Sequence, residues 1–226
     1  MSAMCAESVW AATYVMAYSL PIVSDAVQGG SVALNIVQSS DGRRQRSERS
    51  QTAIIEAALA LMDEGTLVPT AQQIADRAGV GIRSFFRHFA DMDSLFLAAD
   101  EMLISSYEAL FEVDNRAGTL SERVARAIEL YGNAFEKLRP IILCTQAQLW
   151  RSPKLQENYG WHQKRLRKEL ELWLPEVAEL PKDRREAVHA AASFGLWHQL
   201  REFQGLSTKT SAGIVSSLVM DLIASR

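Results

Sequence analysis

The side chains best suited to recognising another molecule lie in the segment 69–89, which reads PTAQQIADRAGVGIRSFFRHF. Thr70 and Gln73 have the spacing of a capping box, which predicts the start of a short helix. Gly79 stands where that helix would end in a left-handed turn. A second helix is expected over residues 81–89, because its apolar residues fall on one side at 100° per residue. The segment therefore predicts two short helices joined by a turn.

The two sides of the second helix differ in chemistry. The apolar side consists of Ile82, Phe85, Phe86 and Phe89, and the polar side consists of Arg83, Ser84, Arg87 and His88. Arginine can bond to phosphates and to guanine edges, and a hydroxyl or an imidazole adds further hydrogen bonds. Because buried phenylalanines would anchor the helix, the pattern indicates a helix-turn-helix whose second helix can enter a DNA major groove.

The segment from Arg46 to Leu95 resembles the DNA-binding domain of TetR-family transcriptional regulators. It contains, in the family's order, an apolar helix, a glycine, a helix started by threonine, the turn IADRAGV, an aromatic helix ending in F, and an acidic-flanked position before a leucine. The resemblance implies a repressor that binds a palindromic operator in double-stranded DNA as a homodimer and that a small-molecule effector releases. We expect the DNA contacts to come from Arg46, Thr70, Arg83, Ser84, Phe86, Arg87 and His88.

Three positions depart from the family's usual residues. Gly81 stands where a serine or threonine is common, Phe86 where a tyrosine is common, and Met92 where a lysine is common. Each change removes a group that could contact phosphate. We therefore expect Arg83 and Arg87 to compensate, because arginine contacts both phosphate and guanine.

The charge of the chain bears on how it could bind DNA. The 226 residues carry a formal net charge of −3, so binding must depend on a local basic face. Arg43, Arg44, Arg46 and Arg49 form the densest basic cluster, just before a helix expected over residues 47–63. They could form an arm that reaches a phosphate or a minor groove, or they could be the solvated start of that helix.

The first 42 residues form a segment of a different kind, with no Lys or Arg. It lacks the positive leading region of a signal peptide, and its apolar run is interrupted by Pro21 and Asp25, so it does not fit a membrane helix either. We expect a poorly ordered extension, or upstream sequence translated from an over-early start; the alternative is a short apolar helix that docks on the body. Cys5 and Cys144 match no metal or redox spacing and suggest a reducing compartment, so we expect a cytoplasmic protein without a membrane partner.

The remaining chain lacks sustained alternation of polar and apolar residues, so the predicted fold is all-α. We divide it into a helix-turn-helix domain, 43–95, and an effector-binding and dimerisation domain, 96–226. Helices are expected over 91–113, 119–140, 141–150, 152–174, 181–204 and 208–224, with Pro140 and Pro175 as stops. The last two helices are rich in apolar residues. They could close the core of the monomer, or pair with a second copy as the resemblance implies.

Aromatic residues with a few polar neighbours recur in the second domain. An apolar cavity with few polar groups suits a small molecule, and the resemblance implies an effector site there. The alternative is that these side chains fill the core. The candidate residues are Tyr107, Phe111, Tyr131, Phe135, Gln146, Trp150 and Trp161.

The sequence offers no motif for catalysis. Its four histidines have no metal-ligand spacing, and it contains neither a phosphate-binding glycine loop nor a nucleophile motif. We therefore expect no metal, no cofactor and no enzymatic activity. The competing hypothesis is a helical enzyme or ligand-binding protein with an incidental helix-turn-helix.

Overall fold

The computed structural model describes residues 34–111 and 115–224, and the described residues form helices without a strand, as the all-α prediction requires. The chain divides into two units, residues 1–44 and 45–226. Most of the N-terminal extension, residues 1–33, lies outside the described residues. No helix in the described part of the chain is long and apolar enough to cross a membrane.

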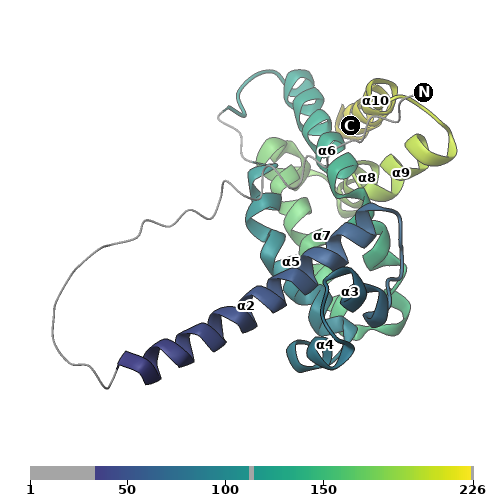
Figure 1. Cartoon of the computed structure of the whole chain (residues 1–226). Helices are drawn as coiled ribbons and strands as arrows, with labels where there is room; N and C mark the ends of the chain where they lie inside the picture. Colours follow the sequence, from purple (N-terminus) through teal and green to yellow (C-terminus); the bar gives the residue numbers. More distant parts are fainter. Residues whose placement is uncertain (1–33, 112–114, 225–226) are drawn as a thin grey trace, which may run out of the picture. The chain divides into compact units, whose positions relative to one another are not determined.

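The helices follow one another along the chain with short connections (Figure 1). The α-helices are α2 (Leu34–Asp63), α3 (Ala71–Arg77), α4 (Ile82–His88), α5 (Met92–Ala109), α6 (Leu120–Gln146), α7 (Pro153–Trp173), α8 (Lys182–Ala191), α9 (Phe194–His198) and α10 (Thr208–Ala224). Short 3-10 helices are η1 (Leu149–Arg151) and η2 (Pro175–Glu179), and η3 (Gln199–Phe203) is a π-helix. Figure 1 shows α10 lying beside α6 and α8, with which it makes extensive contact.

Helix α2 begins at Leu34, well before the expected start near residue 47. The segment between these points contains no proline, and Gly42 alone costs about 1 kcal/mol in a helix. The four arginines between 43 and 49 therefore lie within a helix, and their contact with a phosphate or a minor groove stays a prediction.

Helix starts agree closely with their local signals. The Oγ1 atom of Thr119 accepts a hydrogen bond from the N–H of Glu122, and α6 begins at the next residue, Leu120. Ser152 accepts a hydrogen bond from the N–H of Leu155 (3.1 Å), and Pro153 is the first residue of α7. These signals work because each cap satisfies backbone N–H groups that the first helical turn leaves unpaired.

Pro140 does not end a helix, contrary to the expectation, because α6 continues through it to Gln146. A proline in a helix interior costs about 3 kcal/mol, since it removes a backbone hydrogen bond. Beyond it, Cys144 is 1% exposed, and Ile141 and Ile142 are partly buried against different hydrophobic clusters. Burying such side chains yields about 1.5–3 kcal/mol each, which outweighs the cost of the proline.

The prediction of a single helix over 181–204 is also wrong, because the chain forms two separate helices there, α8 and α9. Ser193 Oγ donates to the carbonyl of Ala190 (2.7 Å) and accepts from the N–H of Leu196 (3.4 Å). A serine that bonds to nearby backbone in this way favours a cap over a helix interior. The break turns Phe194 and Trp197 inward, where they are 4% and 5% exposed.

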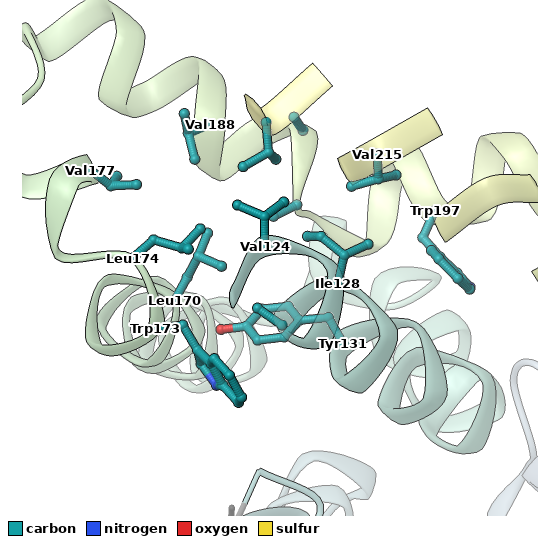
Figure 2. Close-up of a cluster of buried hydrophobic side chains, with 14 of the residues drawn as sticks. Val124, Ile128, Tyr131, Leu170, Trp173, Leu174, Val177, Val188, Trp197 and Val215 are labelled. Atoms are coloured by element: carbon teal, nitrogen blue, oxygen red, sulfur yellow. The ribbon is translucent and has the colours of Figure 1, made fainter. Parts of the chain in front are cut away.

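Two clusters of buried side chains stabilise unit 45–226. The head core consists of Ile54, Ile55, Ala57, Ala58, Met62, Ile74, Ala75, Phe85, Phe89, Leu95, Phe96, Ala99, Cys144 and Leu155. The body core consists of Val124, Ala127, Ile128, Tyr131, Phe135, Leu170, Trp173, Leu174, Val177, Val188, Ala191, Ala192, Phe194, Trp197, Leu200, Val215, Val219 and Ile223. Figure 2 shows the centre of the body core, where side chains from α6, α7 and the C-terminal helices converge.

Candidate functional site: a DNA-binding surface and an internal cavity

The turn between α3 and α4 has the geometry expected from its sequence. Thr70 and Gln73 form the capping box, with the N–H of Gln73 donating to Thr70 Oγ1 (3.2 Å). Gly79 has a φ of +67°, which a residue with a side chain rarely adopts. The N–H of Val80 then donates to the carbonyl of Ala75 (3.0 Å), which closes the turn. Phe85 of α4 is fully buried in the head core and anchors the helix.

The outer face of α4 presents Arg83 and Arg87 to solvent. Arg87 Nη2 donates to Ser84 Oγ (2.8 Å), so the serine orients this guanidinium before any partner binds. Because a guanidinium held in one rotamer loses less entropy on binding, Ser84 preorganises Arg87 for contact with a phosphate or a base.

Phe86 differs from the expectation of a buried phenylalanine, because it is 53% exposed. At 100° per residue it lies between the apolar Ile82 and the polar Arg83, at the border of the two sides. Its ring packs edge-on against Phe85, with the centroids 5.2 Å apart. Phe86 therefore belongs to the exposed surface of α4, where a DNA backbone could contact its ring.

His88 is less accessible than its place on the polar side suggested. Its Nε2 atom is buried and has no hydrogen-bond partner among the described residues. Burial, and to a smaller extent the charge of Arg87, lowers the pKa of His88, so the imidazole is neutral near pH 7. It therefore adds no positive charge to this surface.

The neighbouring groups that could contact phosphate are arranged as follows. Thr70 is exposed, and its hydroxyl takes part in the capping box. Gly81 caps α4 without a side-chain hydrogen bond, so the group lost at this position is not replaced locally. Arg46 lies exposed on α2, near the start of unit 45–226. Arg77 is engaged by Glu64 at 2.5 Å and has a raised pKa through that bond.

A second feature is a cavity of about 600 Å³ between α5, α6 and α7. Its apolar wall consists of Phe111, Phe135, Leu138, Ile141, Ile142 and Leu166. Its polar lining consists of Asp100, Tyr107, Glu108, Arg116, Thr145, Asn158, Tyr159, His162, Gln163, Arg165 and Glu169. A volume of this size with an apolar wall and several polar groups suits a drug-sized molecule.

The structure brings three of the predicted effector residues to this cavity, namely Tyr107, Phe111 and Phe135. The other four lie elsewhere. Tyr131 is 3% exposed in the body core, and its hydroxyl donates to the carbonyl of Leu166 (2.6 Å). Gln146 is exposed and donates to Tyr159 Oη (2.9 Å).

The two predicted tryptophans, Trp150 and Trp161, are 81% and 45% exposed and do not line the cavity. Trp150 lies in η1, beyond the end of α6. Trp161 belongs to α7 but stands one residue before the cavity-facing His162, and its ring packs on Arg165. Aromatic content alone was therefore a poor guide to the side of each helix that faces the cavity.

Residues of α7 that line the cavity but were not among the seven candidates follow a helical spacing. They recur every three or four residues along the helix: Asn158, Tyr159, His162, Gln163, Arg165, Leu166 and Glu169. The sequence contains this spacing, but the positions carry both polar and apolar residues, so they do not form an apolar stripe that would indicate a cavity. Asp100 of α5 belongs to no sequence pattern that would have indicated a cavity.

The charges that line the cavity are arranged in pairs. Arg116 binds Glu169, and Arg165 Nη2 binds Glu108 Oε1 (2.6 Å). Asp100 faces His162 instead, with its Oδ2 atom 2.8 Å from Nε2 of the imidazole. It also accepts a hydrogen bond from Asn158 Nδ2 (3.0 Å).

Tyr107 lines the cavity and has a hydroxyl that makes no hydrogen bond within residues 34–111 and 115–224. Its Oη atom is buried and has no hydrogen-bond partner among the described residues. Burial and the charge of Asp100 raise the pKa of Tyr107, so the phenol remains protonated. Its ring meets His162 edge-on, with the centroids 6.1 Å apart. In the described part of the chain no group of three or more His, Cys, Asp or Glu residues could hold a metal ion.

Helix α5 belongs to both the helix-turn-helix and the cavity. Near its start, Leu95 and Ala99 are buried in the head core. Further along, Asp100 and Tyr107 line the cavity. A shift of this helix would therefore alter both regions.

Helix α6 makes a second connection beyond Pro140. Ile141 both lines the cavity and packs against the head core. The Cys144 thiol donates to the carbonyl of Thr66 (3.4 Å), in the loop after α2. Burial raises the pKa of this thiol to about 11, so it is an unreactive core group.

Comparisons with known proteins agree with this architecture. The family model of bacterial regulatory proteins, tetR family, matches residues 54–99. A transcriptional regulator from Rhodococcus sp. Rha1 is 20% identical, with a TM-score of 0.58 over 78% of this chain and 95% of that one. A regulator of the TerR/AcrR family from Aquifex aeolicus VF5 is 18% identical, with a TM-score of 0.50 over 74% of this chain and 96% of that one. Curated protein sequences give no match.

The matched residues 54–99 include α3, the turn, α4 and the first part of α5. They define a helix-turn-helix DNA-binding domain, and the structural similarities show that the whole fold is one that transcriptional regulators adopt. Residues 54–99 therefore match the DNA-binding domain of the tetR family, and the chain is a DNA-binding transcriptional regulator.

Proposed function

We propose that the protein is a repressor that binds a palindromic operator as a homodimer and leaves it when a small molecule occupies the cavity. The observation that carries this proposal is the position of α5, whose residues belong to the head core at one end and to the cavity lining at the other. The helix-turn-helix domain of this proposal comprises residues 43–95, and the effector and dimerisation domain comprises residues 96–226. As a regulator of chromosomal genes, the protein would act in the bacterial cytoplasm.

In this proposal α4 enters the major groove and its two exposed arginines make the main contacts. Arg83 and Arg87 lie four residues apart, on the same side of the helix. Arg87, held by Ser84, is the better preorganised of the two for a base edge. Phe86 and Thr70 would lie against the DNA backbone, and Arg46 would reach a flanking phosphate. His88, which is neutral and partly covered, would serve mainly to position the helix.

The ligand response is proposed to act through α5. A ligand shifts an equilibrium only if it binds one state more tightly than the other. A molecule in the cavity contacts α5 at Asp100, Tyr107 and Glu108, so a ligand that prefers a different position of α5 would move the head. Ile141 of α6 contacts both regions and would move with it.

The homodimer is proposed to form through the C-terminal helices. Ile214 and Leu218 of α10 are 36% and 41% exposed, one turn apart, and Phe203 is 70% exposed. Gly213 of α10 has no neighbour within 4 Å of an added Cβ atom, which leaves room for a second helix to approach. A dimer also suits the DNA contact, because two recognition helices on a two-fold axis read two half-sites one helical turn apart.

The proposal is tested by selecting DNA from a random pool and measuring binding to the selected fragment by fluorescence anisotropy. We expect a palindromic sequence, an affinity that falls steeply with salt, and much weaker binding to a scrambled fragment. Light scattering should give a dimer with and without DNA. A transcription assay with the fragment upstream of a promoter then distinguishes a repressor from an activator. Binding without sequence preference, or a monomer on DNA, would contradict the proposal.

A further inference from the structure

The cavity has an imbalance of charge at one position. Three carboxylates line it, but two of them are bound to arginines, Glu169 to Arg116 and Glu108 to Arg165. Among the described residues, Asp100 has no arginine or lysine as a partner and faces His162. An arginine is always charged, whereas a histidine is charged only when protonated. Asp100 is therefore the one carboxylate of the described cavity lining that no arginine balances.

A polar group that a ligand could bond to, the hydroxyl of Tyr107, lies beside Asp100. Tyr107 Oη is buried without a hydrogen-bond partner, and its ring packs edge-on against His162. Asp100 and Tyr107 both belong to α5 and both line the cavity. A hydroxyl that is buried without a partner is costly, and a ligand atom that bonds to it can remove that cost.

We infer that the cavity takes a singly charged amine with an apolar, ring-containing body. The inference rests on the proposed function and specifies the ligand class. An ammonium group would donate one hydrogen bond to the carboxylate of Asp100 and another to Tyr107 Oη. The body would lie against Phe111, Phe135 and the other apolar residues of the wall.

Other head groups fit this lining less well. An alcohol could bond to both Asp100 and Tyr107, but it would leave the carboxylate uncompensated. A carboxylate would be repelled by Asp100, and the guanidinium groups that could attract it are already engaged by Glu169 and Glu108. Charge therefore discriminates among ligands of equal size and shape.

The ligand's position has a consequence for regulation. Asp100 of α5 is bonded to His162 and Asn158, which both belong to α7. These bonds connect α5 to α7. An ammonium group at Asp100 would compete for the same carboxylate oxygens and so would loosen that connection.

Three probes that share one body and differ in head group test the inference: 4-phenylbutylamine, 4-phenylbutan-1-ol and 4-phenylbutyrate. Calorimetric titration of the full chain should give the order amine, alcohol, carboxylate, with the amine binding roughly tenfold or more tightly than the alcohol. In Asp100→Asn the amine should lose this advantage while the alcohol stays within roughly threefold of its affinity for the parent. A melting curve establishes that the variant is folded.

Glu108→Gln is the matched control, because it removes the same charge from the lining at a different position. It should keep the preference for the amine, since the contact at Asp100 is intact. His162→Gln is a second control, because it changes the partner of Asp100 and keeps the carboxylate. It should also keep the preference for the amine over the alcohol. Equal loss in Asp100→Asn and Glu108→Gln would overturn the contact at Asp100, because overall charge would then explain the preference.

The same titrations, followed by anisotropy on the selected DNA, separate this inference from the proposed function. If the alcohol or the carboxylate binds as tightly as the amine and releases DNA, the ligand response stands and the inference falls. If the amine is preferred through Asp100 but DNA binding is unchanged, the inference stands and the ligand response falls. Failure of all three probes to bind at millimolar concentration overturns the inference.

Discussion

Replacing Gly132 of α6 with alanine should destabilise the body core, although alanine is the better helix former. A Cβ atom at this position would lie 2.3 Å from Cη2 and 2.7 Å from Cζ2 of the Trp197 ring. The ring cannot move away freely, because its Nε1 donates to Glu136 Oε1 at 2.9 Å. The helix propensity gain of about 1 kcal/mol is therefore opposed by an overpacking cost of roughly 1–3 kcal/mol or more. We expect a net loss of up to about 2 kcal/mol.

Gly160 provides the matched control within the same protein. It lies in the interior of α7, and an added Cβ atom would meet no neighbour within 4 Å. Gly160→Ala should therefore stabilise the protein by about 0.5–1 kcal/mol through helix propensity alone. Urea denaturation of the parent and both variants measures the difference, and thermal melting should show shifts of opposite sign, about 2–4 °C per kcal/mol.

The comparison also decides where Trp197 lies. If Gly132→Ala is stabilised as much as Gly160→Ala, the tryptophan ring does not occupy the space above Gly132. In that case Trp197 would be free to contribute to a dimer interface, and the packing of the body core described above would be refuted.

Three further outcomes are expected. Arg83→Ala and Arg87→Ala should each weaken operator binding by about 1–3 kcal/mol where a base contact is lost, and neither should change the melting temperature. If both variants bind the operator like the parent, α4 is not the recognition helix. Leu218→Glu should give monomers by light scattering, whereas Leu172→Glu, at another exposed leucine, should remain dimeric; a dimeric Leu218→Glu would place the interface elsewhere. Burial lowers the pKa of His189 below its ordinary 6.5, so the folded state prefers the neutral ring. The free energy of unfolding should therefore fall as the pH drops below about 6.5, and His189→Gln should reduce that dependence in denaturation at several pH values.

The burial of individual residues decides which positions can test the dimer and the cavity. Ala191 of α8 is 8% exposed and belongs to the body core, so a charge there would disrupt the monomer and reveal nothing about the dimer. Thr145 lines the cavity and is therefore a suitable position for a bulky side chain that blocks ligand entry.

The sequence by itself determined the features that depend on a few neighbouring residues. The capping residues Thr70, Thr119 and Ser152 set helix starts to within a residue, because their bonds are made inside one helical turn. Gly79 has a φ of +67° where a turn was expected, since a residue with a side chain is strained there. The helix-turn-helix is built almost entirely from such local signals.

The tertiary structure alone decided the features in which distant residues compete. Pro140 stays inside α6 because burial of the residues after it outweighs a local cost. Tyr131 and Tyr107 looked alike in sequence, yet one hydroxyl bonds to the carbonyl of Leu166 in the core while the other lies unpartnered beside the cavity. Asp100 meets His162 across 62 positions of the chain. Pairings at such separation depend on how whole helices pack, and no local pattern of residues specifies them.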